Sequence, residues 1–96
     1  MKNMNLALFS QYLGEGFSLE LADATSTRLE LIEVKDLSRT QSAKNQSFSL
    51  VFQGAGDVFL SQKTYALNHE KIGTFDLFLV PIGQNATGFR YEAVFN

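Results

Sequence analysis

The chain contains one histidine and no cysteine among its 96 residues. A single histidine cannot supply a His-based metal triad, and His69 would be the one candidate base of a Ser-His-Asp triad. No serine lies in the G-x-S-x-G elbow that exposes a nucleophile, and the lack of cysteine removes thiolate nucleophiles, disulfides and the usual zinc sites. Because His69 lies at the end of a predicted strand, we expect it to be a hydrogen-bonded structural residue. The sequence therefore predicts no enzyme, no metal site and no cofactor.

A second group of polar side chains lies near the C-terminus. Asp76 interrupts an apolar stretch, where a charge is costly unless it is paired or faces solvent. Arg90 is its predicted cross-strand partner, because opposite charges on neighbouring strands attract. Glu92 lies on the same strand face as Arg90. Alternatively Asp76, Arg90, Tyr91 and Glu92, with His69 as a further candidate, orient a small polar ligand in the interior of a ligand-binding β-barrel.

Apolar residues that recur every second position predict the strands that position these side chains. The chain is organised around its last hairpin, residues 74–96, in which a turn rich in Gly and Asn separates two strands. We expect Pro81 at the end of the first, where a missing N–H donor costs little. A phase slip within residues 28–37 indicates either a β-bulge or a strand buried on both faces. The predicted strands are residues 17–21, 28–37, 48–53, 64–69, 75–80 and 89–95.

A short helix is expected before the first strand. Asn5 is a suitable N-cap, Leu6, Phe9 and Leu13 form an apolar stripe, and Gly14 suits a left-handed helix end. This predicts a helix over residues 6–13 that covers one open end of the sheet. Residues 38–47 contain one apolar side chain in ten and predict a solvated connection, with a binding loop as the alternative. The fold class is therefore mainly β, in one domain over residues 1–96. We expect a small antiparallel six-stranded barrel or curled sheet with one short N-terminal helix.

Some apolar side chains are left over once the core is assigned. Most of the nine Phe and three Tyr residues fall at inward positions, but Phe78, Val80 and Val94 fall on the second face of the hairpin. Apolar side chains there need the helix or another protein to cover them. Unpaired edge strands would also invite strand addition. We therefore predict an interaction face at these three residues, for a protein partner or for self-association, including a homodimer.

The charge balance excludes some partners. The formal net charge is −2, and the eight basic residues are spread along the chain, so a nucleic-acid-binding face is not expected. An electrostatic membrane anchor is equally disfavoured. The N-terminal residues contain no apolar core of a signal peptide, and no apolar run approaches the ~20 residues that span a bilayer. We expect a soluble, cytoplasmic protein.

The hairpin also carries a resemblance. Residues 75–83 (FDLFLVPIG) and 88–96 (GFRYEAVFN) resemble a small bacterial family of uncharacterised domains, as do residues 13–17, 48–54 and 65–69. Ser61 and Glu70 stand where that family leads us to expect prolines. The resemblance implies that the domain is encoded near proteins with phage-tail-collar-like domains. It implies no catalytic residues. It implies a non-enzymatic interaction or assembly domain, an accessory of a tail-like or surface-fibre structural protein, with the ligand-binding barrel as the alternative.

Overall fold

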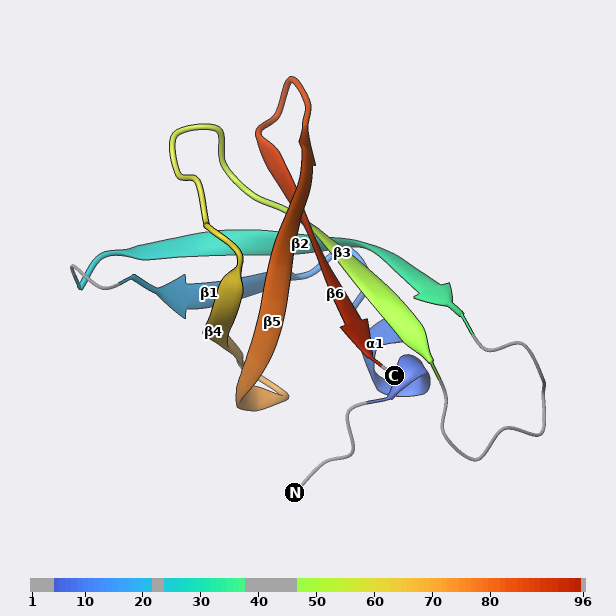
Figure 1. Cartoon of the computed structure of the whole chain (residues 1–96). Coiled ribbons are helices and arrows are strands. Elements are labelled where there is room, and N and C mark those ends of the chain that lie inside the picture. The colour runs from blue at the N-terminus through green and yellow to red at the C-terminus, as the bar shows by residue number, and fades with distance from the viewer. Residues whose placement is uncertain (1–4, 22–23, 38–46, 96) are drawn as a thin grey trace.

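The computed structural model describes residues 5–21, 24–37 and 47–95, so nearly all of the predicted 38–47 connection lies outside the described residues. One short helix precedes six strands (Figure 1). The elements are α1 (Leu6–Ser10), β1 (Gly16–Glu20), β2 (Ser26–Asp36), β3 (Phe48–Gln53), β4 (Lys63–His69), β5 (Gly73–Gln84) and β6 (Phe89–Phe95).

The strands form a closed antiparallel barrel in the order β1-β2-β3-β6-β5-β4. Pairing of β4 with β1, through Ser18 opposite Asn68 and Leu19 opposite Leu67, closes it. The predicted barrel with a short N-terminal helix is confirmed. The predicted unpaired edge strands are wrong, because closure gives both ends of the sheet a partner.

Two irregularities bend the barrel. The register of β2 against β3 shifts between Leu31 and Glu33, and the intervening Ile32 is exposed whereas Leu31 is buried. Of the two predicted alternatives, a β-bulge or a strand buried on both faces, the structure has the bulge. A second shift lies between Pro81 and Gly83 in β5. The prediction that the strand ends at Pro81 is wrong, because β5 continues to Gln84 and the irregular pairing beside the proline tolerates its missing N–H.

Inward side chains fill the barrel. Alternate residues of each strand point inside, and α1 adds Phe9, which is fully buried. The ring of Phe9 lies 6.1 Å from that of Phe48, 5.9 Å from Phe75 and 5.7 Å from Phe95. Phe9 therefore closes one end of the barrel, and Figure 1 shows α1 beside the C-terminal end of β6. The other buried hydrophobic residues of this core are Phe17, Leu19, Leu29, Leu31, Phe48, Leu50, Phe52, Leu60, Tyr65, Leu67, Leu77, Leu79, Tyr91 and Ala93.

The helix is shorter than predicted. Asn5 is its N-cap, and its Oδ1 accepts the Leu8 N–H at 2.8 Å. Because α1 ends at Ser10, the predicted place of Leu13 in the apolar stripe is wrong, and Leu13 is 54% exposed. Gly14 has the expected left-handed conformation, with φ of 89°. Its N–H donates to Leu31 O at 2.7 Å, which fixes the approach of the chain to β1.

Candidate functional site

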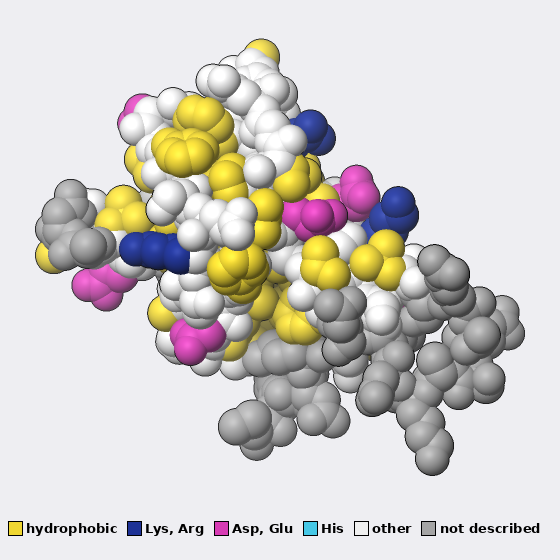
Figure 2. Space-filling model, in the orientation of Figure 1, with side chains coloured by type: hydrophobic (Ala, Val, Ile, Leu, Met, Phe, Trp, Pro, Cys, Tyr) yellow, Lys and Arg dark blue, Asp and Glu magenta, His cyan; other side chains and the backbone are white. Residues whose placement is uncertain are grey.

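The outer surface of the β5–β6 hairpin carries apolar side chains. Phe78 is 51% exposed and Val94 is 50% exposed, whereas Val80 is half-buried. These three residues form the face that we call the outer hairpin face. Strand alternation places them there, because the intervening Leu77, Leu79 and Ala93 fill the core. In Figure 2 hydrophobic side chains gather over β5 and β6, with acidic and other polar side chains between them.

Register shows how this face is arranged. Val80 lies opposite Glu92, and Val94 lies opposite Ser49 on β3. The pairing of β5 with β6 reaches no further than Val80 and Glu92, and beyond this pair the two strands diverge (Figure 1). Phe78 lies opposite the exposed Thr64 of β4. The structure thus places all three predicted residues on the outside of the barrel wall, each opposite a small or polar residue.

The predicted pair of Asp76 with Arg90 is wrong. Arg90 lies opposite Gly83 on β5 and Gln53 on β3, whereas Asp76 lies opposite Ala66 on β4. Gly83 is seven positions after Asp76, which corresponds to roughly 20 Å along a strand. The two charges therefore lie at opposite ends of the hairpin.

The predicted ligand cluster is also divided between the two sides of the barrel wall. Tyr91 is fully buried in the core, whereas Arg90 and Glu92 alternate with it and point outward. Asp76 alternates with the buried Leu77 and is exposed on the outside as well. These four residues cannot surround one interior ligand, because the strand places the phenol on one side of the wall and the charges on the other.

Tyr91 has a structural role instead. Its hydroxyl accepts the N–H of Leu60 at 2.9 Å and lies 3.4 Å from Val58 O, to which it donates. Burial raises the pKa of Tyr91 above its ordinary value; the Leu60 hydrogen bond lowers it and nearby Tyr65 raises it further. The buried phenol thereby ties the segment between β3 and β4 to the core.

Arg90 has an unfilled donor. Its Nε is buried and has no hydrogen-bond partner, although the residue as a whole is only half-buried. A Cβ at Gly83 would lie 3.3 Å from Nη2 of Arg90, so the guanidinium lies against the glycine backbone. A guanidinium with a free donor favours an acceptor, above all a carboxylate.

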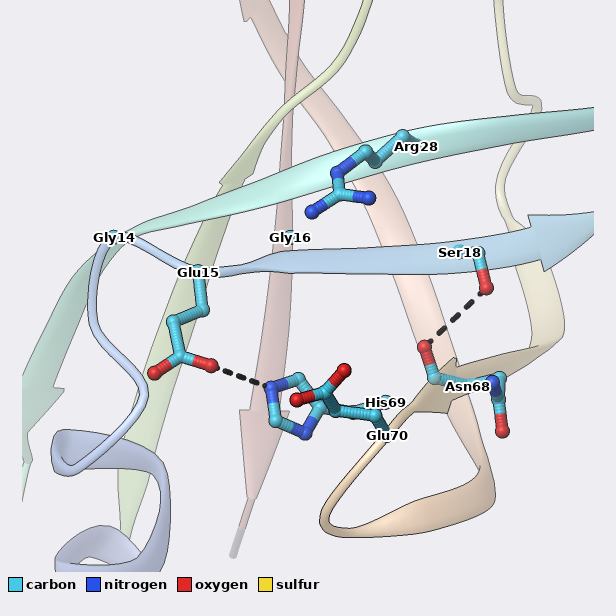
Figure 3. Close-up of a pocket in the computed structure, with 8 residues that line it drawn as sticks. All are labelled: Gly14, Glu15, Gly16, Ser18, Arg28, Asn68, His69 and Glu70. Carbon is cyan, nitrogen blue, oxygen red and sulfur yellow. Dashed lines mark hydrogen bonds and ion pairs between the residues drawn. The ribbon is translucent and has the colours of Figure 1, made fainter.

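A polar depression of about 400 Å³ lies beside His69 (Figure 3). Residues of β1 and of its two neighbouring strands, β2 and β4, line it. Glu15 reaches His69 from the turn before β1, and Arg28 extends from β2 over Gly16. None of the other members of the predicted polar cluster lines it. The lining residues are Gly14, Glu15, Gly16, Ser18, Arg28, Asn68, His69 and Glu70.

Two aromatic rings and two hydrogen bonds fix the position of the His69 ring. It is 4% exposed, and its ring lies 4.6 Å from that of Tyr12 and 4.8 Å from that of Phe17. Nδ1 accepts the Lys71 N–H at 3.1 Å, and Nε2 lies 2.8 Å from Oε1 of Glu15. Since Nδ1 accepts, the ring proton is on Nε2 and is donated to Glu15.

This arrangement suits a structural histidine better than a catalytic one. Both ring nitrogens of His69 are engaged, so no lone pair is free to take a proton from a substrate. The sequence identified His69 but not Glu15, because nothing in the strand pattern indicates that the turn before β1 meets the end of β4. Within the three described segments, no group of three or more His, Asp or Glu side chains could hold a metal ion. No helix in those segments is long and apolar enough to cross a bilayer.

With this geometry established, comparison with known proteins gives one match. The chain belongs to a family described as a domain of unknown function (DUF6916), whose model matches residues 4–95. No curated protein and no solved structure matches the chain. The match confirms the resemblance to a small uncharacterised domain family, and it assigns neither an activity nor a partner.

Proposed function

We propose that this domain works by binding another protein rather than by catalysis, and that the outer hairpin face is its contact surface. The observation that carries the proposal is the exposure of two large apolar side chains, Phe78 and Val94, on the outside of the neighbouring strands β5 and β6. Because the barrel is closed, the proposed contact is face to face and uses side chains, in place of strand addition at an edge.

The fold does not use the apolar side chains of the outer hairpin face for its own packing. The inward neighbours Leu77, Leu79 and Ala93 already fill the core, and α1 lies at an end of the barrel against Phe48, Phe75 and Phe95. An exposed aromatic side chain is a common anchor of protein interfaces. The proposal includes a cytoplasmic location, which a chain without cysteine permits. It also includes the partner class that the sequence resemblance implies, a tail-like or surface-fibre structural protein.

Site-specific photo-cross-linking tests the proposal. A photoreactive phenylalanine analogue replaces Phe78, and in a matched control it replaces Phe59, which is 58% exposed and packs on Phe89 instead. Each protein is irradiated in lysate of the source organism, and the products are identified by mass spectrometry. We expect a discrete protein product from position 78 that position 59 does not give, and Val94→Lys in the same chain should suppress it. If position 78 gives no product above the control, this surface is not a contact and the proposal fails.

A further inference from the structure

The polar depression beside His69 crosses β1 on the outside of the barrel (Figure 3). Gly16 and Ser18 form its floor, and they face outward because they alternate with buried residues of the same strand. The two neighbours of β1, β2 and β4, supply its sides. Its volume of about 400 Å³ lies at the small end of the range of ligand pockets, roughly 300–1,000 Å³. None of its lining residues belongs to the outer hairpin face, so a ligand here is independent of the proposed function.

Arg28 supplies a positive charge on the β2 side of the depression. It lies opposite Ser18 in the register, and its side chain extends over Gly16, where an added Cβ would overlap the guanidinium. The φ of Gly16 is not positive, so the backbone does not require glycine there, and the missing side chain gives the guanidinium its place. Arg28 makes no ion pair with any residue that the structure describes. Its forked N–H donors are therefore available to an incoming carboxylate.

Two carboxylates supply negative charge on the β4 side. Glu15 uses Oε1 for His69, and its Oε2 has no hydrogen-bond partner among the described residues. Glu70 follows His69 directly at the end of β4, and within the described ranges it forms no ion pair. In Figure 3 the two carboxylates lie on one side of Gly16 and the Arg28 guanidinium lies on the other. The depression therefore offers acceptors for an ammonium group opposite its donors for a carboxylate.

We propose that this depression binds a small zwitterion of the α-amino acid type, with its carboxylate on Arg28 and its ammonium group at Glu15 and Glu70. The balance of charge selects this class. A phosphate or other dianion would meet two carboxylates of its own sign, and a simple cation would meet the guanidinium and leave its donors without an acceptor. A molecule that carries both charges satisfies both sides of the depression at once.

The exposure of these charges sets the strength of binding. Arg28, Glu15 and Glu70 are all exposed, and ion pairs at exposed sites are weakened by water and by salt. We therefore expect a dissociation constant of about 1–10 mM for glycine, the smallest α-amino acid, at low ionic strength. Added salt should weaken the binding further, because it screens both charged contacts.

Titration monitored by nuclear magnetic resonance tests the proposal, with the two halves of the ligand as controls. Amide signals of isotope-labelled protein are followed at constant ionic strength during addition of glycine, of acetate, which has the carboxylate alone, and of methylammonium, which has the ammonium group alone. Glycine should shift the signals of Gly16, His69 and Glu70 to saturation, and each half-molecule should bind about tenfold more weakly. No saturable shift by about 100 mM glycine, or acetate or methylammonium that binds as tightly as glycine, would overturn the inference.

Single substitutions assign the contacts, with circular dichroism as the check on folding. Arg28→Gln and Glu70→Gln each remove one exposed charge, and each should weaken glycine binding about tenfold. Gly16→Ala keeps every charge but places a methyl group where the guanidinium lies, so it should weaken binding as well. Arg90→Gln removes a positive charge from β6, away from the depression, and as the matched control it should leave the affinity unchanged. Wild-type affinity in any of the first three variants, or an equal loss in Arg90→Gln, would overturn the proposed contacts.

Discussion

The imidazole of His69 donates its Nε2 proton to Oε1 of Glu15 across 2.8 Å. This contact joins the turn before β1 to the end of β4, and these are the two strands whose pairing closes the barrel. Among the described residues, that closing seam has two register pairs, Ser18 with Asn68 and Leu19 with Leu67. The side-chain hydrogen bond therefore reinforces the pairing that has the fewest register pairs in the described part of the sheet.

Substitution of Glu15 separates the hydrogen bond from the charge. Glu15→Ala removes the acceptor of a buried N–H, so the free energy of unfolding should fall by about 1–2 kcal/mol. Glu15→Gln keeps an acceptor oxygen without the charge, and the loss should stay below about 1 kcal/mol. Urea denaturation of both variants at one pH measures the difference. Equal losses in the two variants would show that the contact acts through charge instead of through the hydrogen bond.

The sequence predicted a structural His69 but could not identify its partner. Glu15 lies 54 positions away, and the two meet only because β4 closes onto β1. The same reason explains the wrong pairing of Asp76 with Arg90. Alternation reveals which side of the sheet a residue faces, but it does not fix the register, and here the register separates the two charges.

Phe9 and Leu13 provide a matched test of the helical cap. Phe9 is fully buried between rings from three strands, whereas Leu13 is exposed. Phe9→Ala should lower the free energy of unfolding by about 3–5 kcal/mol, because it opens a cavity at the end of the barrel. Leu13→Ala should change it by less than about 0.5 kcal/mol. Chemical denaturation measures both, and similar losses would show that α1 does not close the core as described.

Both residues had been predicted in one apolar stripe, and this shows the limit of helical periodicity. The spacing from Phe9 to Leu13 fits a helix, but α1 ends at Ser10. The N-cap at Asn5 and the left-handed Gly14 were predicted correctly, because they depend on local backbone chemistry alone. Local signals were thus more reliable than the length inferred between them.

Gly88 is expected to tolerate no side chain. Its φ is 150°, and an added Cβ would overlap the carbonyl oxygen of Gly54 and the backbone of the next two residues. Gly14 is the control, since it also has positive φ but has nothing within 4 Å of an added Cβ. Gly14→Ala should cost about 1 kcal/mol through backbone strain alone. Gly88→Ala should cost more than about 2 kcal/mol, because the β3 end and the hairpin turn must also move apart. Thermal denaturation of the two variants measures the losses of stability. Equal losses would contradict the close approach of Gly88 to the backbone of residues 54–56.

Tyr91 should make stability depend on pH in the alkaline range. Burial raises its pKa in the folded protein above the ordinary tyrosine value of 10.0. The phenol stays protonated in the folded state while it ionises in the unfolded state, so the unfolded state binds fewer protons above pH 10. Stability from this group is therefore fully present below pH 10 and is lost as the pH rises from there through the folded pKa.

Tyr91→Phe isolates this effect. At pH 8 the variant should be less stable by about 1–2 kcal/mol, because the buried Leu60 N–H loses its acceptor. The other tyrosines are common to both proteins, so the difference in free energy of unfolding between wild type and variant reports Tyr91 alone. As the pH rises above 10, that difference should shrink, because the wild type loses a stabilising contribution that the variant lacks. Urea denaturation from pH 8 to pH 11, with tyrosinate absorbance as the check on ionisation, measures it. A difference that is constant over this range would show that the phenol ionises as easily in the folded barrel as in the unfolded chain, and that burial does not hold its proton.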